Sequence, residues 1–346
     1  MQHRVFVAGI ALVLSAACRE GGDDSSLENL GLAVGLLVGS GELQALRVPE
    51  FSQGGTDLNG DGDLLDEVLH VFDFATGLTT NLGLDQRGPL AVGGNLVAFG
   101  VSEEDQGATD LNGDGDTSDD VLHVYDSATE LTTNTGFALN GLPAIGISTV
   151  AFLVFEPTQG DGDLNSDGDT LDFVLHLYDA RTLVTTSAQR AATSNPLFHD
   201  HAFAFTTDEP SAGTDLNGDG DASDTTIFEL YDLLLGGVVQ TLYALRPGAM
   251  PLAVGVDDWI LLLDEAGQDL DLNGDGDRVD GDWFQIDPHG ASYIQLGISS
   301  LAASSSTDDD SVLALVAQEI AGLHSNGDGD QLDTLDVLHD PAHEQT

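Results

Sequence analysis

The stretch Asp57-Leu-Asn-Gly-Asp-Gly-Asp-Leu-Leu-Asp66 recurs along the chain and decides the fold. Its six copies are separated by 53, 53, 52, 56 and 53 residues. A near-constant period of this size indicates a repeat architecture, in which each copy contributes one supersecondary unit. The copies begin at Asp57, Asp110, Asp163, Asp215, Asp271 and, in altered form, His324.

The frame shared by the copies, Asp-x-Asn-x-Asp-x-Asp-x-x-Asp, is typical of a cation-binding loop. In the first copy, Asp57, Asn59 and Asp61 place oxygen atoms on one side of a tight loop, and Gly62 allows the sharp turn that wraps them round an ion. Hard oxygen ligands suit calcium, which accepts six to eight of them in flexible geometry. The frame therefore predicts a calcium site in each copy.

The first half of this frame resembles the EF-hand calcium loop. Asp63 stands where that loop uses a backbone carbonyl, and Val68 stands where it has a bidentate Glu. We therefore expect Asp66, at position ten, to close the site. No helix pattern flanks the frame, and the Asp-rich loops set between strands of integrin-type propeller blades are closer, although their closing Asp comes one place earlier.

Five or six bound Ca²⁺ ions are therefore the predicted cofactor. A solvated acidic loop is the alternative, but it does not require Asn and Gly at fixed places in six copies. His324 and Ser325 replace Asp-Leu in the last copy, so weak or no binding is expected there, whereas Ser166 for Gly in the third copy should matter little. The predicted ligands are Asp57, Asn59, Asp61, Asp63 and Asp66; Asp110, Asn112, Asp114, Asp116 and Asp119; Asp163, Asn165, Asp167, Asp169 and Asp172; Asp215, Asn217, Asp219, Asp221 and Asp224; Asp271, Asn273, Asp275, Asp277 and Asp280; and Asn326, Asp328, Asp330 and Asp333.

The composition excludes several classes of partner. The 346-residue chain has a net charge of −52 and only 8 basic residues, all of them Arg, so nucleic acid and anionic membrane surfaces are poor partners. The repeated frame supplies 23 of the 60 acidic residues. The other acidic residues lie outside the frame, and their negative charge predicts a soluble protein with an acidic surface.

The first residues read as an export signal. Arg4 precedes an apolar stretch from Val5 to Leu14 that is too short to span a membrane. The single cysteine, Cys18, follows the small residues Ser15-Ala16-Ala17 and excludes an internal disulfide framework. This resembles a bacterial lipoprotein signal, with Ser15 where that motif prefers Leu. The resemblance implies a signal peptide at 1–17, lipidation of Cys18, a tether at 18–26 and a place in the cell envelope; secretion without a lipid is the alternative.

Each repeat contains four short β patterns. In the second, Pro89–Gly94 and Asn95–Phe99 form two apolar segments, the acidic loop follows, and Val121–Tyr125 is rich in β-branched and aromatic residues. Leu131–Asn134 begins a fourth strand after a polar turn. Four strands in about 53 residues are the layout of one propeller blade. We predict an all-β, six-bladed propeller over residues 27–346, with four antiparallel strands in each blade.

The two ends of the chain predict how the ring closes. The sixth copy lacks a fourth strand of its own after Val337–His339, and Leu27–Leu32 resembles the fourth strand of the first copy, Thr80–Leu84. We expect 27–32 to complete the sixth blade. The blade cadence, with its Tyr-Asp-x-Ala-Thr-Gly-like turns, resembles TolB-type propellers. That resemblance implies the fold and leaves the activity open.

Two further sets of side chains have competing interpretations. His70, His123, His176 and His339 share one position of the third strand, where Glu229 and Gln285 also occur. A ring of metal-binding histidines is less favoured than a shared hydrogen-bonding position between blades. His199 and His201 flank Asp200 and offer a small site, and Trp259 and Trp283 are expected in the core rather than stacked on sugars.

The predicted function is a calcium-binding, exported propeller that acts as a binding or scaffold module rather than as an enzyme. No nucleophile elbow, zinc motif or phosphate loop is present in the sequence. The alternative is a calcium-dependent phosphoester or lactone hydrolase with an axial site, for which only Arg87 and Arg246 offer basic groups in plausible loops. The expected partner is an unidentified protein or glycan, membrane contact is through the lipid only, and the chain is expected to be a monomer.

Overall fold

The computed structural model describes residues 30–160, 162–254, 258–272, 276–279, 281–287, 292–296, 313–318 and 334–339. The predicted signal peptide, Cys18, the tether and the sixth acidic loop lie outside these residues. Within the described part, no helix is long and apolar enough to cross a membrane.

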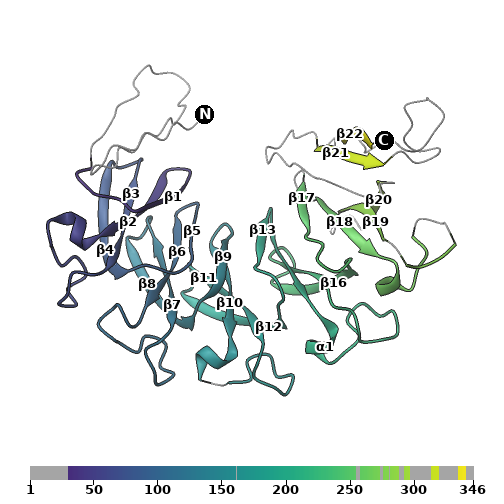
Figure 1. Cartoon of the computed structure of the whole chain (residues 1–346), viewed down its shortest axis with the longest axis horizontal. Coiled ribbons are helices and arrows are strands. Elements are labelled where there is room, and N and C mark those ends of the chain that lie inside the picture. The colour runs from purple at the N-terminus through teal and green to yellow at the C-terminus, as the bar shows by residue number, and fades with distance from the viewer. Residues whose placement is uncertain are drawn as a thin grey trace. The chain divides into compact units, whose positions relative to one another are not determined.

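Five four-stranded antiparallel sheets follow one another along the chain (Figure 1), and each has its strands in sequence order. They are sheet one, β1 (Leu36–Ser40), β2 (Leu43–Pro49), β3 (Glu67–Asp73) and β4 (Leu78–Asp85); sheet two, β5 (Leu90–Gly93), β6 (Leu96–Ser102), β7 (Asp120–Asp126) and β8 (Leu131–Ala138); sheet three, β9 (Asn140–Ile145), β10 (Thr149–Phe155), β11 (Phe173–Asp179) and β12 (Val184–Ala191); sheet four, β13 (Leu197–His199), β14 (Ala202–Thr207), β15 (Ile227–Asp232) and β16 (Val238–Ala244); and sheet five, β17 (Leu252–Val254), β18 (Asp258–Asp264), β19 (Gly281–Asp287) and β20 (Ser292–Gln295).

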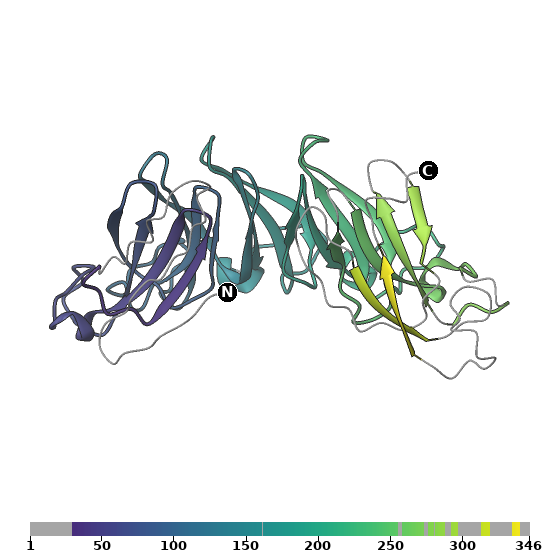
Figure 2. The ribbon, with the colours of Figure 1, turned by 90° about the horizontal axis from the view of Figure 1, so that it is seen from above.

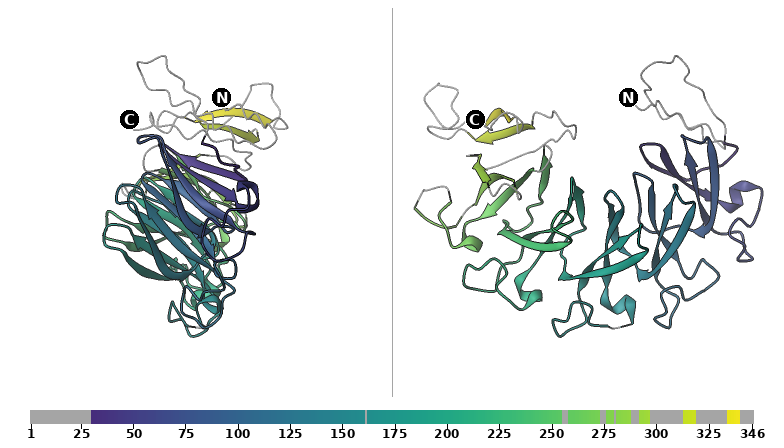
Figure 3. Two further views of the ribbon diagram at one scale, coloured as in Figure 1. Left: turned by 90° about the vertical axis from the view of Figure 1, so that its left-hand side faces the viewer. Right: turned by 180° about the vertical axis from the view of Figure 1, so that it is seen from behind.

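A further pair of strands, β21 (Leu313–Gln318) and β22 (Thr334–His339), stands where the sixth repeat was predicted. The chain is thus an all-β protein with the up-and-down four-stranded sheets of a β-propeller, which confirms the predicted fold class. The described residues fit six blades. Figures 2 and 3 show the same sheets from three further directions.

Two compact units divide these sheets. One contains the residues up to Leu164 and Phe173–Ser187, and the other contains Asn165–Asp172 and the residues from Ala188 onward. The boundary therefore passes through the third acidic loop. Each unit is described by itself below.

The first unit has its cores between successive sheets. Along β6, Val97 and Phe99 pack with residues of sheet one, whereas Leu96 and Ala98 pack with residues of sheet three. All four side chains are buried. Because successive residues of a strand point to opposite faces, a strand buried on both faces is a continuous apolar run, as the sequence has here.

The second unit has a core of the same kind between sheets four and five. Trp259 of β18 is 1% exposed and packs with Phe228 of β15, whose ring centroid is 5.5 Å away. Leu261 on the same face of β18 belongs to the same cluster. The prediction that Trp259 lies in the core is confirmed.

The predicted closing strand 27–32 falls only partly within the described residues. Leu30, Gly31 and Leu32 are not in a strand, and Leu30 and Leu32 pack against Leu46 and Phe72 of sheet one. Residues 27–29 lie outside the described part. Closure of the ring by this segment stays a prediction.

Candidate metal centre

The acidic loops connect the second and third strands of each sheet, as predicted. The first runs from β2 to β3 and the second from β6 to β7. Four of the five described loops begin with a short helical turn, and the second begins with a non-helical turn. The helical turn is η1 (Glu50–Gln53) in the first loop and α1 (Glu209–Ala212) in the fourth. The corresponding turns of the third and fifth loops are η2 (Glu156–Gln159) and η3 (Ala266–Gln268).

In the first, second and fourth copies, the first aspartate of the frame folds the loop back on itself. Asp57 Oδ1 accepts a hydrogen bond from Gly60 N at 2.6 Å, and Oδ2 accepts one from Gly62 N at 3.2 Å. Gly62 has φ of 106°, a conformation that a side chain rarely tolerates. The same pair of bonds recurs at Asp110 and Asp215. The loop geometry thus explains why Gly stands at the sixth position.

Serine at position four of the third copy differs from the expectation. Ser166 has φ of 66°, close to the 83° of Gly60 and Gly113 at the same position. This left-handed region favours glycine, so the replacement places a strained residue in the loop. Gly168 keeps the turn at φ 109°, as predicted.

The asparagine at position three joins the two halves of the loop. Asn59 Nδ2 donates to Asp66 Oδ2 at 2.8 Å, while its Oδ1 accepts from Asp61 N at 3.3 Å. We name the residues at position ten the closing aspartates. The structure places three further asparagines against their own closing aspartates: Asn112 on Asp119 at 3.2 Å, Asn165 on Asp172 at 3.1 Å, and Asn217 on Asp224 at 2.8 Å.

A buried glutamate that was not predicted from the sequence stands at the start of each of the five described loops. We name Glu50, Glu103, Glu156, Glu209 and Glu265 the loop glutamates, and all five are 0% exposed. Glu103 Oε1 accepts from Leu111 N at 2.5 Å, and Oε2 accepts from Asp119 N at 3.2 Å. Its own N–H donates to Asp119 O at 3.0 Å. One buried side chain therefore bonds both the start and the end of the acidic frame.

The signal for these glutamates was present in the sequence. Glu50, Glu103, Glu156 and Glu209 recur at intervals of 53 residues, the main period of the acidic frame. Each precedes the first aspartate of its frame by six or seven residues. They were overlooked because they follow directly on an apolar strand and stand outside the Asp-rich stretch.

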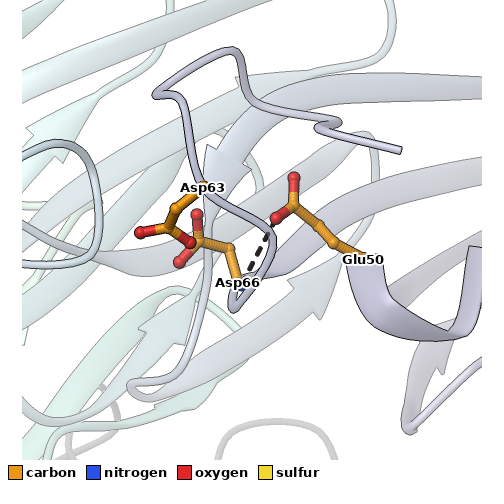
Figure 4. Close-up of side chains that lie close together, drawn as sticks. All are labelled: Glu50, Asp63 and Asp66. Atoms are coloured by element: carbon orange, nitrogen blue, oxygen red, sulfur yellow. Dashed lines mark hydrogen bonds between the residues drawn. The ribbon is translucent and has the colours of Figure 1, made fainter. Parts of the chain in front are cut away.

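The carboxylates of the first loop point towards one another (Figure 4). One oxygen each of Glu50, Asp63 and Asp66 lies within 4.8 Å of the other two. Glu50 and Asp66 are buried, and Asp63 is exposed. The equivalent residues of the second loop, Glu103, Asp116 and Asp119, form the same group. Asp63 stands where the EF-hand loop uses a backbone carbonyl, and the structure places its side-chain carboxylate in this group.

Electrostatics make this arrangement unfavourable without a cation. Burial, together with the charges of Asp61, Asp85 and Asp63, raises the pKa of Asp66 to about 7 against the opposing bond from Asn59. Burial likewise raises the pKa of three further closing aspartates: Asp119 to about 6, Asp172 to about 7 and Asp224 to about 6. The folded loops hold these groups where ionisation is costly.

One closing aspartate has a cationic neighbour. Arg87 lies 3.9 Å from Asp66 and also pairs with Asp105 at 3.1 Å and Asp85 at 3.7 Å. Among the described residues, no Arg or His forms an ion pair with Glu103 or Asp119 of the second loop. The same holds in the fourth loop for Glu209 and Asp224.

The recurrent histidines have a structural contact within their own strands. The Nδ1 atoms of His70, His123 and His176 lie 3.1–3.2 Å from the carbonyl oxygens two residues earlier, and burial lowers the pKa of all three. The strand pairing shifts register at His70 and His123. The predicted bond between blades is therefore corrected, because the bonded carbonyl belongs to the histidine's own strand. The side chain of His339 lies outside the described residues.

Several other predicted residues are placed as follows. His201 Nε2 pairs with Asp200 at 3.1 Å, while the ring of His199 lies 5.3 Å from that of Trp259, so the two histidines have different neighbours. Trp283 is half-buried. In the fifth loop, Gly276 N donates to Asp271 Oδ2 at 3.1 Å. The predicted ligands outside the described part are Asn273, Asp275, Asp280, Asn326, Asp328, Asp330 and Asp333.

Comparison with known proteins gives a likeness of architecture only. A scan of protein-family models gave no match, and a search of curated proteins gave none either. Among solved structures, the chain is similar to the β-propeller domain of the Trilobed protease from Pyrococcus furiosus, with 8% identity, a TM-score of 0.46, and 84% of this chain and 78% of that chain covered.

TolB structures show a similar level of likeness. TolB from Acinetobacter baumannii has 13% identity and a TM-score of 0.32, with 72% of this chain and 57% of that chain covered. A putative TolB from Agrobacterium tumefaciens has 11% identity and a TM-score of 0.34, with 78% and 83% covered. Values this low assign no activity, and the fold is established by the strand order and register of the sheets themselves.

Proposed function

We propose that this protein is an exported, calcium-binding β-propeller that serves as a binding or scaffold module. The observation that carries the proposal is the acidic group in the second loop, where oxygens of buried Glu103, half-buried Asp119 and exposed Asp116 converge within 4.8 Å. Like charges this close, with no cationic side chain among their described ion-pair partners, favour either protonation or a bound cation. A bound cation would neutralise the clustered carboxylates of every copy of the repeat in the same way.

Calcium is the ion that suits the donor set best. Every predicted ligand offers an oxygen atom. The loop is held closed by hydrogen bonds to its own backbone and does not impose an octahedral arrangement of ligands. Magnesium demands stricter geometry and retains more of its water, and zinc prefers nitrogen and sulfur ligands. An exported protein also meets calcium at concentrations that fill sites of modest affinity.

Isothermal titration of the mature protein with Ca²⁺ tests this proposal. We expect uptake of about five ions per chain and much weaker heats with Mg²⁺ at equal concentration. The double substitution Asp110→Ala and Asp119→Ala should lower the count by one. The matched control is Asp126→Ala, because Asp126 caps a turn at Ala128 N outside the loops and its loss should leave the count unchanged. A folded wild type that takes up no calcium ends the proposal.

The lipoprotein part of the proposal depends on Cys18 and the small residues before it. Thioether lipidation of that cysteine would hold the propeller at a membrane surface through the tether at 18–26. Expressed in a bacterium with a lipoprotein pathway, the wild type should enter the membrane fraction and incorporate labelled fatty acid. Cys18→Ser should do neither, and equal labelling of both proteins would contradict the assignment.

The partner is proposed to be a protein or a glycan, with the calcium-ordered loops fixing the surface that it meets. The burial of Trp259 removes one of the two tryptophans as a sugar-stacking platform. Arg87, one of two basic groups considered for hydrolysis, is engaged with carboxylates of two successive repeats. These contacts favour the non-enzymatic role.

A further inference from the structure

We propose that the loop glutamates are positioning residues of the calcium sites, an inference that rests on the proposed function. Each stands outside the Asp-rich frame, and none was expected from the calcium-loop pattern. In the second and fourth loops the bonding is the same in detail. Glu209 Oε1 accepts from Leu216 N at 2.7 Å and Oε2 accepts from Asp224 N at 3.1 Å, as Glu103 does with Leu111 and Asp119.

In the first, second and fourth loops, the glutamate bridges the two ends of its frame. Oε1 receives the amide at position two, next to the first predicted ligand, and Oε2 receives the amide of the closing aspartate. The glutamate N–H returns a bond to the carbonyl of that aspartate, at 3.0 Å in the first and second loops and 2.9 Å in the fourth. The closing aspartate is therefore held to the glutamate by two hydrogen bonds.

The number of residues between the glutamate and its frame varies, whereas its hydrogen bond to the amide at position two is constant. Glu50, Glu103 and Glu156 precede their frames by seven residues, and Glu209 and Glu265 precede theirs by six. The amide at position two is still bonded in both cases, at 2.7 Å in the third loop and 2.9 Å in the fifth. The bond from the amide at position two to the glutamate is present although the intervening turn differs by one residue. The glutamate is therefore placed relative to the frame and not relative to the turn.

A buried carboxylate is a costly way to satisfy two amides, because backbone or neutral acceptors would suffice. Its negative charge becomes useful beside a cation, since charge-assisted bonds to both ends keep the ligands in place while the charge itself attracts the ion. In the second loop one Glu103 oxygen lies within 4.8 Å of oxygens of Asp116 and Asp119. The glutamate thus acts on the ion both by position and by charge.

Glu103→Gln tests the inference in the full mature chain, with Glu104→Gln as the matched control. Glutamine keeps the size of the side chain but places an NH₂ donor against one of the two amide donors. Glu104 is adjacent and exposed, so its substitution removes the same formal charge without touching the loop ends. Hydrogen exchange of peptides covering each loop, followed over a range of free calcium, gives the calcium midpoint of every loop separately.

We expect the calcium midpoint of the second loop to rise about tenfold or more in Glu103→Gln, the size of effect seen when a group that orients metal ligands is removed. The midpoint of the fourth loop should stay unchanged in the same molecules, and Glu104→Gln should match the wild type. Glu209→Gln should give the reverse pattern, with a raised calcium midpoint in the fourth loop alone. This second variant provides the test if Glu103→Gln does not fold.

The outcomes separate this inference from the proposed function. Calcium-dependent protection in wild-type loops, with unchanged midpoints in both glutamine variants, overturns the positioning role and leaves calcium binding intact. Equal loss of stability with and without calcium, at an unmoved midpoint, shows a purely structural residue and also overturns it. A wild type without calcium-dependent protection in any loop refutes the proposed function, and the positioning role with it.

Discussion

Removal of calcium at neutral pH is expected to lower the melting temperature of the mature protein by on the order of 10 °C. At an ion concentration ten times the dissociation constant, each site contributes about 1.4 kcal/mol to the free energy of unfolding. Two or three sites in each compact unit then contribute about 3–4 kcal/mol. A domain of this size shifts by about 2–4 °C per kcal/mol.

Differential scanning calorimetry in 1 mM Ca²⁺ and in excess chelator measures this shift. Return of calcium after chelation should restore the original melting temperature, which separates ion loss from damage. Chelator with an equal excess of Mg²⁺ is the control, and it should give the lower value because magnesium suits these loops poorly. Identical melting in calcium and in chelator would show that the loops are not stabilising sites.

Much of this arrangement could be predicted from the sequence, because the repeat itself fixes local chemistry. Glycine at position 62 predicts a turn that needs positive φ, and Gly62 has φ of 106° in the structure. Asp66 is predicted to close the site because position twelve is Val68, and the structure places its carboxylate in hydrogen-bond contact with Asn59 of the same loop. Local rules suffice for these features, which lie within the ten-residue frame itself.

Contacts that depend on strand pairing were not predicted from the sequence, for physical reasons. Glu50 meets Asp66 only because β2 and β3 pair, which brings residues on either side of a long loop together. The bond from His70 to its own strand depends on a shift of register between Val68 and His70, which side-chain pattern alone does not reveal. Strand pairing and its irregularities therefore decide which polar residues serve the site.

Stability of the calcium-free protein is expected to fall as pH rises through the range from about 4 to about 7, and Asp66→Asn should weaken this trend. The pKa of Asp66 is about 7 in the folded chain against an ordinary 3.8, so the folded state keeps a proton that the unfolded state has lost. Stability decreases with pH wherever the folded state binds more protons. The contribution is fully present below about pH 4 and is lost as pH rises through 7.

The difference between the two proteins isolates this carboxylate. Buried His70, His123 and His176 have lowered pKa values and act in the opposite sense below pH 6.5, but they are common to both chains and cancel. In calcium-free buffer, Asp66→Asn should therefore gain stability relative to the wild type with rising pH, by at most about 1.4 kcal/mol per pH unit. Urea unfolding between pH 4.5 and 7.5 gives the two curves.

Calcium should reverse the ranking of the two proteins. A bound ion replaces the proton on Asp66 and favours the ionised form, whereas asparagine at this place offers a weaker ligand. At pH 7.5 in 1 mM Ca²⁺ the wild type should be the more stable protein, and in chelator the variant should be. A pH-independent difference between them would mean that Asp66 does not ionise within this range, and an unchanged ranking in calcium would remove Asp66 from the site.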